Sequence, residues 1–127
     1  MKFPAPELLP AAMDRWSARA SALLLQAAGD LSMAAAISYE FVRIHPFPDF
    51  NGRVSRLLLN VCLRLAGVPF WSSIQGHKEG KKRYLQALRR ANRGDLRWYE
   101  ALVAEAVCRG FDAMDQNLEA AGLPTLQ

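Results

Sequence analysis

The sequence predicts an all-α fold. Apolar residues recur at helical spacing along almost the whole chain of 127 residues, and no stretch alternates apolar with polar residues for long enough to predict a strand. Glycines, prolines and aspartates interrupt this pattern where helices would end or begin. Because 51% of the residues are hydrophobic, the chain can bury one core, and we expect residues 1–127 to form a single domain.

The first two expected helices lead to a stiff loop. An apolar stripe follows Pro10, and Gly29 and Asp30 interrupt it. Asp30 or Ser32 can cap the second helix. That helix must end at His45, because a residue before proline avoids the helical conformation. Two prolines then stiffen the loop HPFPDF. The expected inward stripes are Met13, Trp16, Ala20, Leu23 and Leu24, then Met33, Ile37, Phe41 and Ile44.

Three further helices complete the pattern. One begins near Asn51 and ends before Gly67, and the segment FWSSIQG connects it to a basic helix that stops at Gly94. We expect Asp95 to cap the last helix and Gly110 to kink or end it, with residues 111–127 as the helix end and tail. The expected inward residues are Val54, Leu57, Leu58, Val61, Cys62 and Leu65, then Tyr84, Leu85, Leu88 and Ala91, then Leu96, Tyr99, Leu102, Val103, Ala106 and Val107.

Composition limits the function classes. No apolar run approaches the roughly 18 residues that suggest a membrane span, and the start MKFPAPELLP lacks the apolar core of a signal peptide. We therefore expect a cytoplasmic protein without a membrane partner, with delivery as a secreted effector left open. The net charge of +4 suits nucleic acid, a phosphate ligand or an acidic protein partner. Cys62 and Cys108 lack metal-ligand spacing and are expected to be free thiols.

The segment from His45 to Arg56 is the strongest candidate site. Gly52 has no Cβ, so an anion can approach the backbone there. The first N–H groups of the following helix have no partners within it and favour an anion. Arg53, Arg56 and Asn60 follow on the expected polar face, where they can bond phosphate oxygens. Arginines gathered at one helix start favour a compact phosphate ligand over nucleic acid.

Two more side chains in this segment can contribute chemistry. Asp49 would repel a bare phosphate, but it suits the Mg²⁺ that phosphates usually bring. A helix cap is the alternative role for Asp49. His45 is the nearby group suited to proton transfer near neutral pH.

The stretch HPFPDFNGRVSR resembles the Fic family signature, H-x-F-x-D/E-G-N-G-R-x-x-R, with one specified position changed. The preceding FVRI, the following LLLN and the stretch KKRYLQALRRANRGDLRWYEALV are also similar to the family, so the resemblance covers about residues 8–108. It implies a Fic-like helical bundle with at most a small residual β-hairpin near the N-terminus. It also implies a Mg²⁺-dependent protein adenylyltransferase, which transfers AMP from ATP to a Ser, Thr or Tyr hydroxyl of a target protein.

The resemblance also implies a role for each matched residue. His45 would be the general base, Phe47 would anchor the loop in the core, and Asp49 would bind Mg²⁺. The phosphates would be bound by Asn51, Gly52, Arg53 and Arg56, with Arg56 on the terminal phosphate. The physical basis of this arrangement is positioning and electrostatic stabilisation around one base.

Gly52 separates this chain from the Doc-like branch of the family. That branch has a similar site with Lys in place of Gly52, and it transfers phosphate, so the resemblance favours transfer of a nucleotide here. No motif in the chain reads the base of the nucleotide. Tyr84 and Leu88 are the candidates for a wall near the base.

Phe50 stands among the expected phosphate-binding residues, where the family has glycine. A phenylalanine with positive φ would strain the loop, and a ring facing the phosphates would crowd the nucleotide. Three interpretations follow: the ring is tolerated in solvent or a cleft, it lowers or abolishes activity, or it changes substrate specificity. The alternative function is therefore a weakened or inactive Fic-like binding module.

The surroundings of the motif also depart from the family. Only residues 1–10 precede the first helix, which is enough for part of the hairpin flap that docks target proteins in the family. No Ser or Thr starts the inhibitory motif S/T-x-x-x-E-G/N, so an inhibitor would be a separate protein, part of a longer chain, or absent. His77 is expected to be a solvated loop residue. The remaining basic residues are expected to form a solvated face, or to hold an acidic partner or the edge of the nucleotide: Lys78, Lys81, Lys82, Arg83, Arg89, Arg90 and Arg93.

Overall fold

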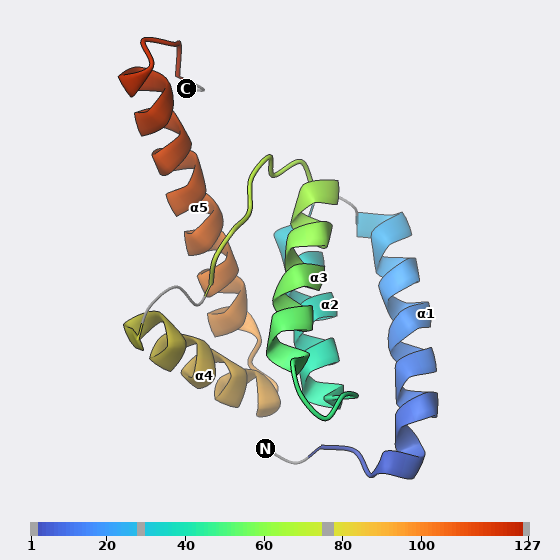
Figure 1. Cartoon of the computed structure of the whole chain (residues 1–127). Helices are drawn as coiled ribbons and strands as arrows, with labels where there is room; N and C mark the ends of the chain where they lie inside the picture. Colours follow the sequence, from blue (N-terminus) through green and yellow to red (C-terminus); the bar gives the residue numbers. More distant parts are fainter. Residues whose placement is uncertain (1–2, 28–29, 75–77, 126–127) are drawn as a thin grey trace.

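The computed structural model describes residues 3–27, 30–74 and 78–125, and these residues form α-helices, one short 3-10 turn and no strand (Figure 1). The predicted all-α fold is confirmed. The elements are the turn Pro6–Leu8 and the helices α1 Leu9–Ala27, α2 Leu31–Ile44, α3 Asn51–Leu65, α4 Lys78–Asn92 and α5 Arg97–Ala120. The expected break at Gly29 and the expected loop residue His77 lie outside the described residues.

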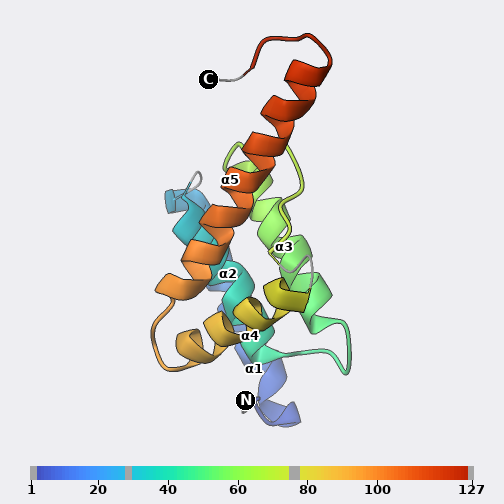
Figure 2. The same cartoon turned by 90° about the vertical axis from the view of Figure 1, so that its left-hand side faces the viewer.

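Helix α2 is the centre of the bundle. It packs against α1, α3 and α5, and Figures 1 and 2 show α1 on one side of it with α3 and α5 on the others. Ala34 and Ala35 are fully buried in α2, and such small side chains allow the neighbouring helices to approach closely. Asp30 caps this helix by accepting a hydrogen bond from the Ser32 N–H at 2.9 Å, so the first of the two expected caps is the one used.

Helix α3 is rotated relative to the expectation. Leu57, Val61 and Leu65, which were predicted to face inward, are 50%, 50% and 59% exposed. The buried residues of α3 are instead Asn51, Ser55, Leu59, Asn60, Cys62 and Leu63. Apolar residues lie on several sides of this helix, so periodicity does not decide which side turns inward. The side with the small Ser55 packs on α2, where its Oγ donates to the Ser38 carbonyl at 2.7 Å.

Asn60 holds the connector after α3 and does not extend toward a phosphate. Its side-chain amide donates to the Ser72 carbonyl at 3.0 Å, and its Oδ1 accepts the Ser72 N–H at 2.7 Å. Asn60 is only 7% exposed, and its amide also donates to the Arg56 carbonyl at 2.9 Å. The expectation that Asn60 binds a ligand is wrong, because both ends of its amide are used to fix the backbone.

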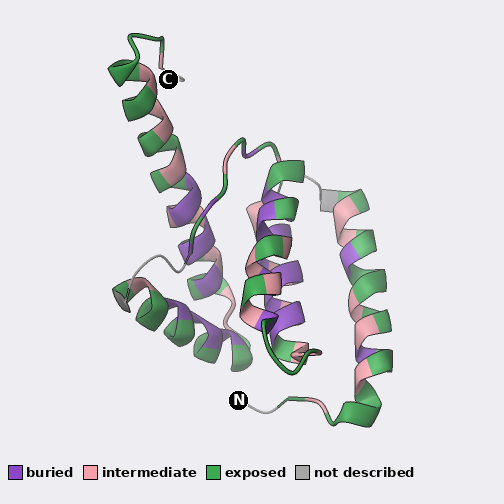
Figure 3. Ribbon diagram, viewed as in Figure 1, coloured by how far each residue is buried: buried purple, intermediate pink, exposed green. Residues whose placement is uncertain are grey.

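Helix α5 begins and continues differently from the expectation. Its N-cap residue is Leu96, although Asp95 accepts the Arg97 N–H at 3.2 Å. Gly110 neither kinks nor ends the helix, which runs on to Ala120. A Cβ at Gly110 would lie 2.0 Å from Cε2 of Phe70, so this glycine makes room for the Phe70 ring. Beyond Gly110 the helix extends away from the bundle and is largely exposed (Figure 3).

Candidate active site

The loop between α2 and α3 starts at His45, which ends α2 in a left-handed conformation. Its φ is 56°, and its N–H donates to the Phe41 carbonyl at 3.1 Å. A left-handed residue reverses the chain sharply, and Pro46 prevents the helix from continuing. The prediction that this helix ends at His45 is confirmed.

Asn51 locks the loop against the start of α3. Its Oδ1 accepts the Phe47 N–H at 3.0 Å, its amide donates to the Phe47 carbonyl at 2.7 Å, and its side chain is buried. Phe47, expected to anchor the loop in the core, is half exposed and contacts the edge of the core at the Phe41 ring, 6.2 Å away between centroids. The loop is therefore held by the asparagine, whose polar atoms are all turned toward the backbone.

At the start of α3, three backbone N–H groups have no hydrogen-bond partner among the described residues. The first main-chain hydrogen bond of the helix runs from the Val54 N–H to the Phe50 carbonyl at 3.0 Å, so the N–H groups of Asn51, Gly52 and Arg53 precede it. Arg56 folds back over this end, because its Nη1 lies 3.1 Å from where a Cβ on Gly52 would be. One guanidinium and the positive end of the helix dipole therefore meet at the same point.

Phe50 has a left-handed backbone conformation, which glycine adopts more easily than phenylalanine. Its φ is 69° and its ψ is 8°, within the left-handed region, and its side chain is 55% exposed. The ring does not fill the core; the guanidinium carbon of Arg53 lies 5.0 Å from its centroid, over its face. The ring therefore occupies the space beside a residue expected to bind phosphate.

One cavity of about 400 Å³ is lined by nine of the candidate residues. The loop and α3 form one side, and α4 forms the opposite wall with Tyr84 and Leu88. The sequence-predicted residues that line this cavity are His45, Asp49, Phe50, Asn51, Gly52, Arg53, Arg56, Tyr84 and Leu88. The loop after α2, the start of α3 and the middle of α4 thus face the same space, which has the size of a typical small-ligand pocket.

Phe3 is a wall residue that sequence reasoning missed. Its ring stacks on the His45 imidazole, with centroids 3.9 Å apart and an angle of 17° between the planes. Phe3 also lines the cavity, together with Leu85 of α4. The His45 Nδ1 is buried and has no hydrogen-bond partner among the described residues. No local pattern in the sequence connects Phe3 to His45, because the contact depends on how the chain start returns to the end of α2.

Tyr84 is a buried wall close to Arg56. The guanidinium carbon of Arg56 lies 6.0 Å from the centroid of the Tyr84 ring, and the phenol oxygen is buried without a hydrogen-bond partner among the described residues. Burial raises the pKa of Tyr84, although the nearby positive charge of Arg56 opposes the shift. The phenol therefore stays neutral near pH 7.

A buried polar cluster beneath the site joins three helices. The Tyr99 hydroxyl of α5 and the Ser38 Oγ of α2 are 2.8 Å apart, and Ser55 of α3 bonds to the Ser38 carbonyl. Burial raises the pKa of Tyr99. Such a cluster fixes the second turn of α3 relative to α2. The helical pattern had assigned Tyr99 to the core but gave no sign of these bonds.

Asp49 is the acidic side chain that lines the cavity. It is exposed, and its Oδ1 accepts the Phe50 N–H at 2.7 Å. No group of three or more His, Cys, Asp or Glu suited to a metal occurs among the residues that the structure describes. One carboxylate oxygen is too few for a protein-built metal site, but it fits Mg²⁺ that phosphates and water coordinate at its other positions.

Comparison with known proteins identifies the family. Residues 1–63 match the model of the Fic/DOC family, a range that contains α1, α2, the loop and most of α3. This chain belongs to the Fic/DOC family. The match includes His45 and every other motif residue of the loop and helix start, and the wall formed by α4 lies beyond it.

Proteins named protein adenylyltransferase Fic are similar to this Fic chain. Those of Aedes aegypti and Culex quinquefasciatus are each 40% identical over 79 residues, 62% of this chain and 15% of the relative. That of Drosophila erecta is 33% identical over 109 residues, 86% of this chain and 21% of the relative. The chain thus spans only 15 to 21% of the length of these relatives. Among the described residues, no helix is both long and apolar enough to cross a bilayer.

Proposed function

We propose that this Fic-family chain is a Mg²⁺-dependent protein adenylyltransferase, which transfers AMP from ATP to a Ser, Thr or Tyr hydroxyl of a target protein in the cytoplasm. The observation that carries the proposal is the cavity shared by His45, the open start of α3 and Arg56. A base, an anion site and a cation lie around one space, as transfer from a phosphate to a hydroxyl requires.

In the proposal, His45 takes the proton of the target hydroxyl as its oxygen attacks the α-phosphorus of ATP. The bond from that phosphorus to the bridging oxygen breaks, and pyrophosphate leaves. The N–H groups at the start of α3 and the guanidinium of Arg56 hold the phosphate oxygens as negative charge shifts toward the leaving group. Arg53 can join them once it leaves the Phe50 ring.

The second oxygen of Asp49 would hold Mg²⁺, which supplies charge neutralisation for the phosphates when it is bound. Asp49 itself is fixed by its bond to the Phe50 N–H, so its carboxylate is oriented before any ligand arrives. Tyr84 and Leu88 would contact the nucleotide from the α4 side of the cavity. The glycine at position 52 supports nucleotide transfer, because the similar Doc-like branch, which transfers phosphate, has lysine there.

The test is transfer of label from ATP labelled at the α-phosphate, with Mg²⁺, to proteins of a cell lysate or to the chain itself. We expect labelling by the wild type or by Phe50→Gly, and loss of labelling in His45→Ala with ATP binding retained. Arg56→Ala should weaken ATP binding, while Arg64→Ala, an exposed arginine on the same helix outside this cavity, is the matched control. Absence of label with both the wild type and Phe50→Gly would overturn the proposal.

A second candidate is an inactive Fic-like binding module. Two contacts favour it: the Phe50 ring covers one side of Arg53, and Phe3 stacks on His45. Both contacts engage groups that the transfer reaction needs. Calorimetry with ATP and Mg²⁺ separates the candidates, because nucleotide binding that depends on Arg56 supports the enzyme and its absence supports the module.

A further inference from the structure

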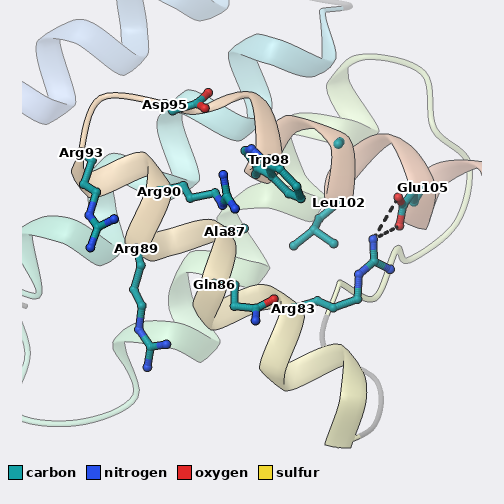
Figure 4. Close-up of a pocket in the computed structure, with 11 residues that line it drawn as sticks. Arg83, Gln86, Ala87, Arg89, Arg90, Arg93, Asp95, Trp98, Leu102 and Glu105 are labelled. Carbon is teal, nitrogen blue, oxygen red and sulfur yellow. Dashed lines mark hydrogen bonds and ion pairs between the residues drawn. The ribbon is translucent and has the colours of Figure 1, made fainter.

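A second and larger concave surface lies between α4 and α5, on the other side of α4 from the nucleotide cavity. This α4–α5 groove has a volume of about 660 Å³ (Figure 4). Tyr84 and Leu88 of α4 face the nucleotide cavity, whereas Arg83 and Arg90 of the same helix line the groove. The groove has no part in the chemistry proposed above, so its composition needs a separate explanation.

The groove carries an excess of positive charge. Its lining contains four arginines, at positions 83, 89, 90 and 93, and two carboxylates, Asp95 and Glu105. Both carboxylates are already engaged: Glu105 pairs with Arg83 at 2.9 Å, and Asp95 pairs with Arg97 at 2.9 Å. Arg89, Arg90 and Arg93 have no ion pair with any described residue, and all three are exposed.

An aromatic ring and an apolar floor lie beside these free arginines. Trp98 is 51% exposed, and the guanidinium carbon of Arg90 lies 3.9 Å from its ring centroid. Figure 4 shows Arg90 directed at the indole, while Arg89 and Arg93 extend outward from α4. Ala87 and Leu102 are buried at the base of the groove. Exposed tryptophan and arginine beside buried apolar groups are the composition of a protein-binding hot spot.

We propose that the α4–α5 groove binds an acidic segment of a partner protein that carries an apolar side chain. The carboxylates of the segment would pair with Arg89, Arg90 and Arg93, and the apolar side chain would pack on Trp98. Arginine binds carboxylates through paired hydrogen bonds, and its stacking on Trp98 holds Arg90 ready for such a bond. The Arg83–Glu105 ion pair closes the end of the groove that is farther from the α4–α5 turn.

A protein segment suits this surface better than nucleic acid. Trp98 is the one aromatic residue among the described residues that line the groove, so successive bases would find no stacking platform there. A segment with spaced carboxylates and one apolar anchor matches both the charge and the floor.

The test is fluorescence anisotropy of a labelled glutamate-rich peptide that carries one phenylalanine, measured without nucleotide so that it is independent of transferase activity. We expect Arg93→Glu and Arg90→Glu to weaken binding about tenfold or more. Lys82→Glu makes the same charge change on the same helix outside the groove, and it should weaken binding far less. The Arg93 side chain has no hydrogen bond or ion pair with any described residue, so its replacement should leave folding intact, which circular dichroism checks.

Three results would overturn the proposal. The first is that the peptide fails to bind the wild type, and the second is that Lys82→Glu weakens binding as much as Arg93→Glu. The third is that a single-stranded oligonucleotide binds the wild type more tightly than the peptide does, and that Arg90→Glu and Arg93→Glu abolish this binding. A peptide with serine in place of phenylalanine tests the anchor. If the indole holds the anchor, the serine peptide should bind the wild type more weakly than the phenylalanine peptide does. The serine peptide should also bind the wild type and Trp98→Ala equally well.

Discussion

Replacing Phe50 with glycine tests both the conformation of the loop and the state of Arg53. A left-handed conformation costs an L-residue roughly 1–2 kcal/mol, which glycine avoids. Glycine also adds disorder to the unfolded chain, a cost of roughly 0.4–1 kcal/mol, and loses the stacking of Arg53 on the ring, worth roughly 0.5–1 kcal/mol at an exposed site. For Phe50, with a φ of 69° and a 55% exposed side chain, these terms nearly cancel. The free energy of unfolding of Phe50→Gly should therefore lie within about 1 kcal/mol of the wild-type value.

Phe50→Ala is the matched control, because it removes the ring but keeps the strain. Alanine keeps the cost of the left-handed conformation, whereas glycine carries the smaller cost of a more disordered unfolded chain. The glycine variant should therefore be more stable than the alanine variant by roughly 0.5–1 kcal/mol. At an ordinary helical position the order is the reverse, since alanine is favoured by about 1 kcal/mol. Urea unfolding followed by circular dichroism measures the difference. An alanine variant at least as stable as the glycine variant would refute the left-handed assignment.

The same two variants report on nucleotide binding. Arg53 must leave the ring to reach a phosphate, so removing the ring should tighten ATP binding by about two- to fivefold, the equivalent of roughly 0.5–1 kcal/mol. Calorimetry with ATP and Mg²⁺ measures the change. In an Arg53→Gln background the gain should vanish. Unchanged affinity in both Phe50 variants would show that Arg53 takes no part in holding the phosphates.

Three further predictions concern the support of the site. Asn51→Ala should lower the free energy of unfolding by about 2 kcal/mol, because two backbone groups of the loop lose a buried partner; urea unfolding measures it. Gly110→Ala should destabilise by about 1–3 kcal/mol through the clash with Phe70, and become neutral or stabilising once Phe70 is replaced by alanine. Stability should fall as the pH rises above about 10, because the unfolded chain then releases the Tyr99 proton that the folded chain retains. Urea unfolding at several pH values measures this fall in stability, and tyrosinate absorbance follows the release of the proton. Tyr99→Phe should make the free energy of unfolding depend less on pH in this range.

The two ends of α2 were predictable because they depend on local chemistry. Pro46 acts on the residue before it, and Asp30 acts on an N–H two residues away, so sequence alone contains both partners. Gly110 shows the limit of this reasoning. A glycine in a helical pattern indicates a break when only propensity is considered, but here its reason is the Phe70 ring, which comes from a segment distant in sequence.

The orientation of α3 was not predictable from its pattern. A stripe such as Leu57, Val61 and Leu65 has the correct period for a buried face, yet it is half exposed. Helix packing depends on how closely two backbones approach, and Ser55 allows a closer approach to α2 than a leucine would. Polar residues such as Ser55 are therefore buried on the side of α3 that faces α2, whereas leucines expected to be buried there are exposed.

Within the candidate site, the motif indicated which residues gather but not how each is used. Asn51 and Asn60 were both expected near a phosphate, but the side chains of both form hydrogen bonds with backbone groups. An amide that can donate and accept is well suited to fix a loop, and a single sequence does not distinguish this use from ligand binding. The contribution of Asn51 to anion binding therefore rests on its main-chain N–H.

In the part of the chain that the structure describes, two non-glycine residues have left-handed backbone angles. They lie at the two ends of the loop, His45 at the end of α2 and Phe50 at the start of α3. Each conformation costs roughly 1–2 kcal/mol, and glycine would remove that cost at either position. At His45 the proposed role as general base accounts for the cost, because glycine cannot transfer a proton. Phe50 supplies no proton, charge or metal ligand, so the reason for its presence must lie in what its ring touches. Among the described residues that contact is Arg53, and the affinity for ATP with and without the ring therefore decides whether Phe50 tunes this site or closes it.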